Sequence, residues 1–164
     1  TSAAHNRSNV IEVMGRHAGY IALYAAMAGG AESAVIPEVE TDFQAIYKKM
    51  LQSKNIGKNH SLSVVAEGAG DHIKIAEDMF EHTGMETKGT NLGYIQRGGA
   101  PSAFDRILGS MMGAIAVELL LKGRKNRAVG IVGNRYVDYD LAEAVKMKKT
   151  IDEEMYRIMN MLSI

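Results

Sequence analysis

The stretch VIEVMGRHAG, residues 10–19, decides the fold that the sequence predicts. Its first four residues form a short, largely apolar and β-branched run, which is typical of a buried strand. Gly15 follows this run, and a helix is predicted from about Arg16 to Ala28. A strand that passes through a glycine turn into a helix is the repeating unit of a sheet with helices on its faces.

The same order of strand and helix continues along the chain. Further strands are predicted at residues 33–37, 61–66, 90–95 and 128–132, and further helices at about 41–51, 73–81, 102–115, 141–147 and 151–162. Alternating strands and helices favour an α/β fold, in which a mostly parallel sheet has helices on both faces.

Two of the predicted helices begin with a recognisable signal. Thr41 with Gln44, and Ser102 with Asp105, both have the spacing of a capping box. Behind Ser102, apolar residues recur at the spacing of one helix face, which is expected to point inward. These residues are Phe104, Ile107, Leu108, Met111 and Ile115.

The composition limits the classes of function. The 164 residues contain 19 Lys and Arg and 19 Asp and Glu, a balance that argues against a nucleic-acid partner. Cys is absent, which excludes thiolate metal sites and a cysteine nucleophile. The stretch Thr1–Asn9 is polar, and the apolar-rich stretch from Tyr20 to Ala31 is too short to span a bilayer. We therefore expect a cytoplasmic protein with no membrane partner.

Polar groups follow three of the predicted strands. Gly15 allows a close backbone approach and Arg16 offers a guanidinium shaped for phosphate, before a helix whose first N–H groups are expected to be unpaired. Glu67 suits sugar hydroxyls, and Arg97 stands beside Gly98 in a second candidate phosphate cradle. Taken alone, each segment is also compatible with an ordinary turn or helix cap. Because ligands bind at the carboxyl ends of such strands, their coincidence indicates a phosphorylated sugar.

Residues 10–19, 65–68 (VAEG) and 92–106 (LGYIQRGGAPSAFDR) are very similar to bacterial 6-phosphofructokinases, and the resemblance extends over essentially the whole chain. It implies the C-terminal, sugar-phosphate-binding half of such an enzyme, with a phosphofructokinase-like sheet. Residues of about 1–100 and 150–164 would form the substrate and effector domain. Residues of about 101–149 would pack on an N-terminal domain.

The resemblance also implies an activity. Members of the family are cytoplasmic, allosteric homotetramers of glycolysis, which transfer the γ-phosphoryl group of ATP to the 1-hydroxyl of fructose 6-phosphate with Mg²⁺. Nucleotides or phosphoenolpyruvate are the effectors that the family implies. In the family, most of the ATP site and the catalytic base lie N-terminal to Thr1, so this chain alone is expected to be inactive.

Site residues follow from the matched motifs. Arg16 and Arg97 would be catalytic, Glu67 would bind sugar hydroxyls, and Arg7 would reach into the site of a neighbouring subunit. The implied substrate-binding residues are Arg7, Met14, Gly15, Arg16, Glu67, Lys88, Tyr94, Ile95, Gln96 and Arg97. The implied effector-binding residues are Gly30, Ala31, Glu32, Lys58, Asn59 and His60, with Glu32 also a candidate Mg²⁺ ligand.

Three positions depart from the family pattern. Lys88 and Tyr94 stand where Arg and His are usual, and Ile56 stands where an effector-binding Arg is common. Lys88 keeps the positive charge but loses the bidentate fork, and an Ile side chain cannot pair with phosphate. Two alternatives stay open: a pyrophosphate-dependent phosphofructokinase, and a non-catalytic half with a regulatory or sugar-phosphate-sensing role.

Overall fold

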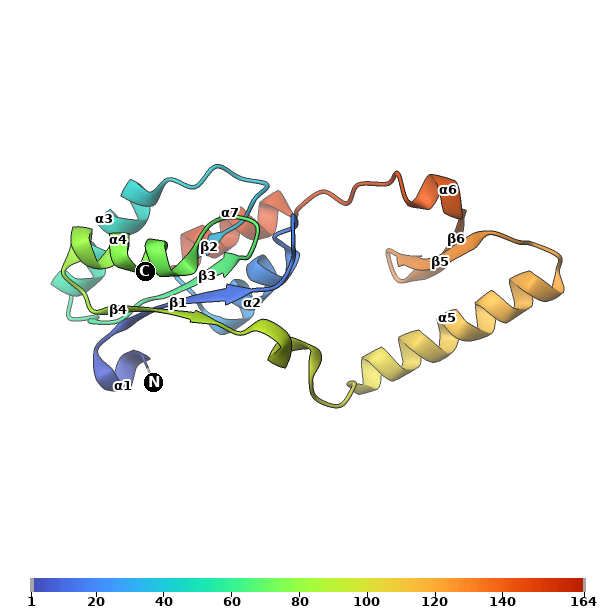
Figure 1. The fold of residues 1–164 in the computed structure, drawn as a ribbon, viewed down its shortest axis with the longest axis horizontal. Coiled ribbons are helices and arrows are strands. Elements are labelled where there is room, and N and C mark those ends of the chain that lie inside the picture. The colour runs from blue at the N-terminus through green and yellow to red at the C-terminus, as the bar shows by residue number, and fades with distance from the viewer. Residues whose placement is uncertain (1, 164) are drawn as a thin grey trace. The chain divides into compact units, whose positions relative to one another are not determined.

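The computed structural model describes residues 2–163, which form two compact units. The first unit comprises residues 2–98 and 151–163, and the second comprises residues 99–150. The chain therefore leaves the first unit after residue 98 and returns to it with its last helix. Figure 1 labels the elements along the chain.

A four-stranded parallel sheet forms the centre of the first unit. Its strands are β1 (Ser8–Val13), β2 (Ser33–Val35), β3 (Leu62–Ala66) and β4 (Thr87–Asn91), in the order β2-β3-β1-β4. β1 lies between β3 and β4, with Val13 opposite Ala66 and Glu12 opposite Asn91. All three strand pairs are parallel, so the predicted α/β fold with a mostly parallel sheet is confirmed.

Helices cover both faces of this sheet, because alternate residues of each strand point to opposite faces. On one face, Val64 packs in a core with Leu23 and Met159. On the other face, its neighbour Val65 packs in a core with Met50 and Met79. The first face is covered by α2 (Tyr20–Gly29) and α7 (Glu153–Leu162). The second face is covered by α3 (Phe43–Asn55) and α4 (His72–Thr83). A short helix, α1 (Ser2–His5), precedes β1.

The segments after β1 and β4 differ from the prediction. α2 begins at Tyr20 instead of Arg16, since Arg16 has a φ of 54° and leaves the right-handed helical region. The predicted strand at 90–95 is wrong beyond Asn91. Gly93, with a φ of 51°, turns the chain into the 3-10 helix η1 (Gly93–Arg97).

Only one of the two predicted capping boxes forms. Asp42, and not Thr41, caps α3, because the Asp42 side chain accepts a hydrogen bond from Ala45 N at 3.0 Å. The capping box of Ser102 and Asp105 is confirmed at the start of α5 (Ala103–Leu121).

The second unit consists of α5, the strands β5 (Arg127–Val132) and β6 (Arg135–Asp140), and α6 (Leu141–Ala144). β5 is not the buried strand that was predicted: it forms an antiparallel hairpin with β6 across Gly133 and Asn134, which both have positive φ. The hairpin packs near the C-terminal part of α5, where Leu119 is buried.

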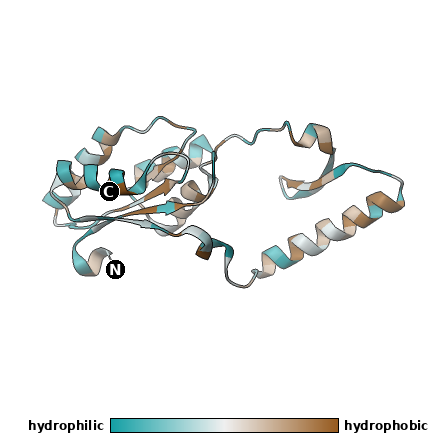
Figure 2. Ribbon diagram, viewed as in Figure 1, coloured by the Kyte–Doolittle hydropathy of each residue, from teal (hydrophilic) through white to brown (hydrophobic). Residues whose placement is uncertain are grey.

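The inward-facing prediction for the first turns of α5 is wrong for the described chain. Phe104, Ile107 and Met111 are 65%, 62% and 44% exposed. Figure 2 shows that hydrophobic residues continue along α5. The hairpin does not cover these turns, so their apolar face has no cover within the second unit.

Candidate functional site

Three segments that carry predicted site residues meet at the carboxyl edge of the parallel sheet. Residues 14–16 follow β1, Glu67 follows β3, and η1 follows β4. Hydrogen bonds join the segments directly, from the loop after β1 to Glu67 and to Gln96. The structure therefore brings together the carboxyl-edge residues that the sequence singled out, while their roles stay predictions.

Glu67 holds the loop after β1. Its Oε1 accepts hydrogen bonds from the backbone N of Gly15 at 3.2 Å and of Arg16 at 2.5 Å. A φ of 54° is unusual for a residue with a Cβ, and these bonds stabilise that conformation at Arg16. Two backbone N–H groups that could have received a phosphate are thus bonded to a carboxylate of the same chain.

Two glycines allow this loop and the end of β3 to approach each other closely. A Cβ at Gly68 would overlap the carbonyl oxygen of Arg16, and a Cβ at Gly15 would overlap that of Ala18. Both obstacles are backbone atoms, which cannot swing aside as the end of a flexible side chain can. A side chain at Gly68 would therefore displace the backbone of Arg16.

The η1 turn presents three of its side chains to solvent. Tyr94, Ile95 and Arg97 are exposed, and the Arg97 guanidinium carbon lies 5.3 Å from the centre of the Tyr94 ring, a cation–π contact. Gln96 differs from them, because its Oε1 accepts from Met14 N at 3.1 Å and its Nε2 donates to Gly93 O at 3.0 Å. The Gln96 amide is thus bonded to the protein on both sides.

One backbone N–H group at the N-terminus of α2, where the sequence predicted open N–H groups, already has a carboxylate partner. The Glu38 carboxylate accepts from Gly19 N through both oxygens, at 2.8 and 3.0 Å. A carboxylate at a helix N-terminus is favoured by the helix dipole. The prediction of open N–H groups there is therefore corrected at Gly19, where Glu38 already supplies the negative charge.

Arg7 and Lys88 lie at the opposite, amino edge of the sheet. Arg7 directly precedes β1, and the register places Lys88 opposite Asn9 near the start of that strand. Arg7 pairs with Glu86 at 2.9 Å. The six residues of β1, at about 3.3 Å each, separate this edge from Arg16 by roughly 20 Å. One chain therefore does not bring Arg7 and Lys88 to the carboxyl-edge residues.

Four of the six predicted effector residues, Gly30, Ala31, Glu32 and Lys58, help to line a pocket of about 120 Å³. Asn59 and His60 do not line it. Glu32 Oε1 pairs with Lys58 Nζ at 2.5 Å, and Glu32 Oε2 accepts from Leu62 N at 2.5 Å. An ammonium so close to the carboxylate does not fit a Mg²⁺ site, and the described residues include no group of three or more potential metal ligands.

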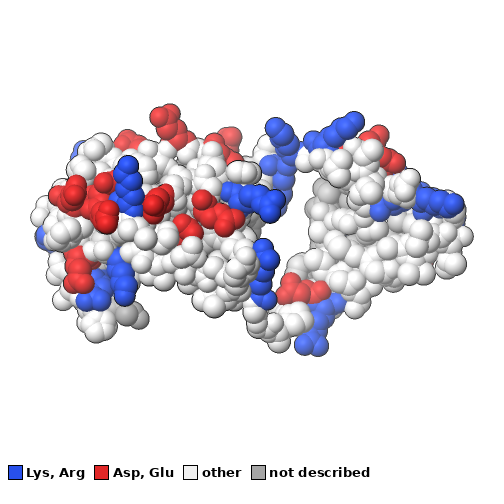
Figure 3. Space-filling view, viewed as in Figure 1, with Lys and Arg blue, Asp and Glu red and all other residues white. Residues whose placement is uncertain are grey.

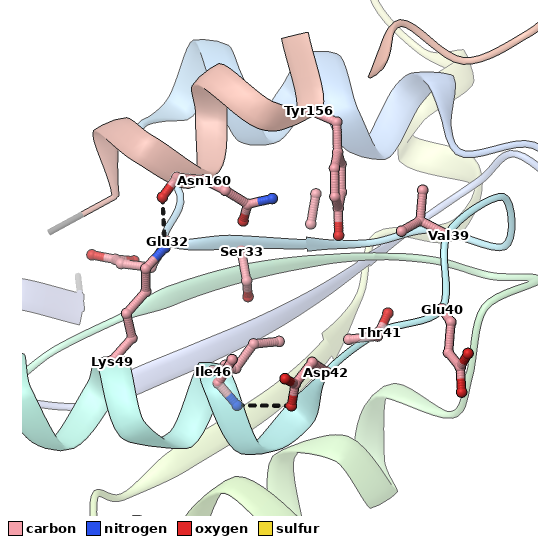
Figure 4. Close-up of a pocket in the computed structure, with 12 residues that line it drawn as sticks. Glu32, Ser33, Val39, Glu40, Thr41, Asp42, Ile46, Lys49, Tyr156 and Asn160 are labelled. Carbon is pink, nitrogen blue, oxygen red and sulfur yellow. Dashed lines mark hydrogen bonds between the residues drawn. The ribbon is translucent and has the colours of Figure 1, made fainter. Parts of the chain in front are cut away.

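A second pocket, of about 300 Å³, lies beside the edge strand β2, between α3 and α7 (Figure 4). Tyr156 projects into it, and Lys49 reaches across from α3 to the carbonyl of Asn160 at 2.7 Å and to the hydroxyl of Ser163. Desolvation lowers the pKa of Lys49, and the nearby Glu32 charge opposes this shift. The sequence analysis did not foresee this pocket, because its walls come from three separate elements.

The sequence analysis also missed a half-buried polar cluster near the carboxyl ends of β1 and β4. Glu12, on β1, accepts from His72 Nδ1 at 2.7 Å and from the side-chain amide of Asn91. The Glu12 and His72 side chains are only 14% and 15% exposed. A carboxylate within the apolar run of β1 was the available signal, since a charge there needs a partner.

Charges on the first unit are mixed in sign. Figure 3 shows acidic and basic side chains intermingled on its visible face, and residues 2–98 and 151–163 carry 10 Lys and Arg against 14 Asp and Glu. Binding of an anion would therefore depend on a few local cations and not on a broad positive surface. Among residues 2–163, no helix is both long and apolar enough to cross a membrane.

The first unit is an α/β domain with a parallel sheet, and such sheets bind ligands at their carboxyl edge. Arg16, Glu67 and Arg97 follow three of its strands at that edge. The chain belongs to the phosphofructokinase family, since the family model described as Phosphofructokinase matches residues 1–120. ATP-dependent 6-phosphofructokinases of Alkaliphilus metalliredigens and Bacillus subtilis are 54% and 49% identical to it over 164 residues. The match covers 100% of this chain and 51% of each relative, so the chain spans about half their length.

Solved structures agree with this family. Phosphofructokinase from Saccharomyces cerevisiae matches 98% of this chain with a TM-score of 0.80 and 30% identity, over 23% of the yeast chain. A pyrophosphate-dependent phosphofructokinase from Nitrosospira multiformis matches 92% of this chain and 44% of its own, with a TM-score of 0.73. Its identity of 24% supports the fold alone.

Proposed function

We propose that this chain is the C-terminal, sugar-phosphate-binding half of an ATP-dependent 6-phosphofructokinase. The full enzyme would transfer the γ-phosphoryl group of ATP to the 1-hydroxyl of fructose 6-phosphate. The observation that carries the proposal is the meeting of Arg16, Glu67 and the Arg97 turn at one sheet edge, in a chain whose curated relatives are named ATP-dependent 6-phosphofructokinase.

Phosphoryl transfer asks a protein mainly for positioning and for positive charge near the moving group. Because the backbone N–H groups of Gly15 and Arg16 are bonded to Glu67, we propose the guanidinium groups of Arg16 and Arg97 as donors to the substrate on this edge. Both arginines are exposed, as a binding role requires. Glu67 is exposed as well, so its carboxylate can also accept from a sugar hydroxyl.

Arg7 and Lys88 are proposed to serve the site of a neighbouring subunit. Their position at the amino edge, roughly 20 Å from Arg16, is too far for one sugar phosphate to touch both groups within a chain. A second copy would supply the missing cations, and this supports a homo-oligomer, proposed to be the homotetramer of the family. The pocket beside Glu32 and Lys58 is the proposed effector site, for a nucleotide or phosphoenolpyruvate.

Most of the ATP site, its Mg²⁺ and the catalytic base are proposed to lie outside this chain. The Glu32–Lys58 pair gives no reason to place the metal here. A pyrophosphate donor and a purely regulatory half are less well supported, because the curated relatives carry the ATP-dependent name.

The test joins this chain to the part of a curated relative that it does not span. We expect the fusion to form fructose 1,6-bisphosphate from fructose 6-phosphate and ATP, and the isolated chain to be inactive in the same coupled assay. Arg97→Ala should lower kcat about 100-fold or more, because it removes charge stabilisation in the transition state. A folded fusion that forms no fructose 1,6-bisphosphate, or an unchanged kcat in the Arg97→Ala variant, would contradict the proposal.

A further inference from the structure

The side chain of Gln96 is hydrogen-bonded to two main-chain groups, one in the loop after β1 and one in η1 itself. Its Oε1 accepts from Met14 N, at the end of β1, at 3.1 Å, and its Nε2 donates to Gly93 O, at the start of η1, at 3.0 Å. The residue is only partly exposed, unlike Tyr94 and Arg97 beside it.

The chemistry of the two partners fixes the orientation of the amide. A backbone N–H can only donate and a backbone carbonyl can only accept, so the Gln96 oxygen must face Met14 and its nitrogen must face Gly93. An amide is the side-chain group that offers a donor and an acceptor together in this way. A glutamate in this place would direct a carboxylate oxygen at the Gly93 carbonyl, and a leucine would make neither bond.

The bridge joins the two segments that carry the proposed catalytic arginines. Met14 is followed by the loop of Arg16, and Gly93 begins the turn that ends at Arg97. The start of the turn is fixed separately, since Leu92 N donates to Glu12 O at 3.1 Å. Gln96 therefore ties the far end of the turn to β1, next to Arg16.

We propose that Gln96 is a positioning residue, which sets the place of the Arg97 turn relative to the Arg16 loop and does not bind the substrate itself. This inference rests on the proposed function and refines it, because the resemblance had assigned Gln96 to substrate binding. A misplacement of about 1 Å at a catalytic group can cost on the order of 100-fold in rate. A polar contact whose only effect is to hold two backbone segments can thus be essential for the reaction.

The first test does not depend on activity. Amide hydrogen exchange is measured by NMR on the 164-residue chain and on its Gln96→Leu and Gln96→Glu variants. We expect the Met14 amide to exchange at least tenfold faster in Gln96→Leu. The factor should be smaller in Gln96→Glu, whose carboxylate can still accept from Met14 N but is repelled by the Gly93 carbonyl. The Gly19 amide, which is bonded to Glu38, should keep its rate. The control is Gln52→Glu, a matched change at an exposed position of α3, which should leave both amides unchanged. An unchanged Met14 rate in Gln96→Leu overturns the bridge.

The second test uses the active fusion. Gln96→Glu and Gln96→Leu should lower kcat about 10- to 100-fold with less than about a threefold change in the KM for fructose 6-phosphate, because the turn is displaced and no substrate contact is lost. A raised KM with an unchanged kcat would mean that Gln96 binds substrate, and the proposal fails. If the unsubstituted fusion is inactive, the proposed function fails. The exchange rate of the Met14 amide in Gln96→Leu, compared with Gln52→Glu, then still decides whether the bridge exists.

Discussion

Replacing Gly68 by Ala should unfold the first unit at a distinctly lower temperature. The new methyl would overlap the carbonyl oxygen of Arg16, and its next neighbours are also backbone, with Arg16 C at 3.0 Å and His17 Cα at 3.4 Å. The loop after β1 must move away, and this movement strains or breaks the hydrogen bonds from Gly15 N and Arg16 N to Glu67.

The size of the effect follows from these contacts. Overpacking against an immobile neighbour costs about 1–3 kcal/mol, and a weakened hydrogen bond adds about 1 kcal/mol. A loss of about 2–4 kcal/mol in the free energy of unfolding should lower Tm by roughly 5–12 °C in a chain of this size.

Thermal unfolding should be followed at the backbone amides of β1 and β3 by NMR, so that the first unit alone is observed. The matched control is Gly29→Ala in α2, where a Cβ would meet nothing within 4 Å. That control should be neutral or stabilising by up to about 1 kcal/mol, because Ala is the better helix former. If Gly68→Ala had the same Tm as Gly29→Ala, the contact between Gly68 and the Arg16 backbone would not be the reason for a glycine at position 68.

Three further predictions concern charge and polar contacts. Lys88→Arg in the fusion should lower the KM for fructose 6-phosphate about fivefold, since a bidentate fork replaces a point charge; an unchanged KM would argue against a phosphate contact. Hydrogen bonds from Ser102 hold the pKa of Asp105 below its usual 3.8, so the carboxylate stabilises α5 fully above that pH and loses this effect as pH falls below it. Amide exchange in α5 between pH 5 and pH 2 should report this loss, and Asp105→Asn should remove the dependence. Glu12→Leu should destabilise the first unit by about 1–3 kcal/mol in urea, because two polar partners lose their acceptor, whereas Glu154→Leu, in an exposed pair, should cost less than about 0.5 kcal/mol.

Local residue type was enough to predict most of the first unit. The apolar runs of β1 and β3 can be recognised without the fold, because a strand pattern spans only a few residues. The same is true of the Ser102 cap in the second unit, whereas the cap of α3 was predicted at Thr41 and is formed by Asp42. The hairpin of the second unit could also have been predicted, because Gly133-Asn134 is a favoured two-residue turn. Only its first strand was predicted.

The site was only partly predictable. Parallel strands must end at one edge, so the meeting of the loop after β1 with Glu67 follows from the pattern. The hydrogen-bond partners do not follow from it. Glu38, Glu67 and Gln96 lie 19, 52 and 82 residues from the N–H groups that they occupy. Such pairings depend on the tertiary structure, and no local pattern reports them.

The discontinuity of the first unit has a consequence for how it is made. Met159 of α7 is 2% exposed and fills the core on the face that α2 covers. During translation the strands and the other helices emerge before the whole of the second unit, and α7 emerges only after it. Until then Leu23 and its neighbours lack part of their apolar cover. The nascent sheet is therefore a candidate client for ribosome-associated chaperones during that interval.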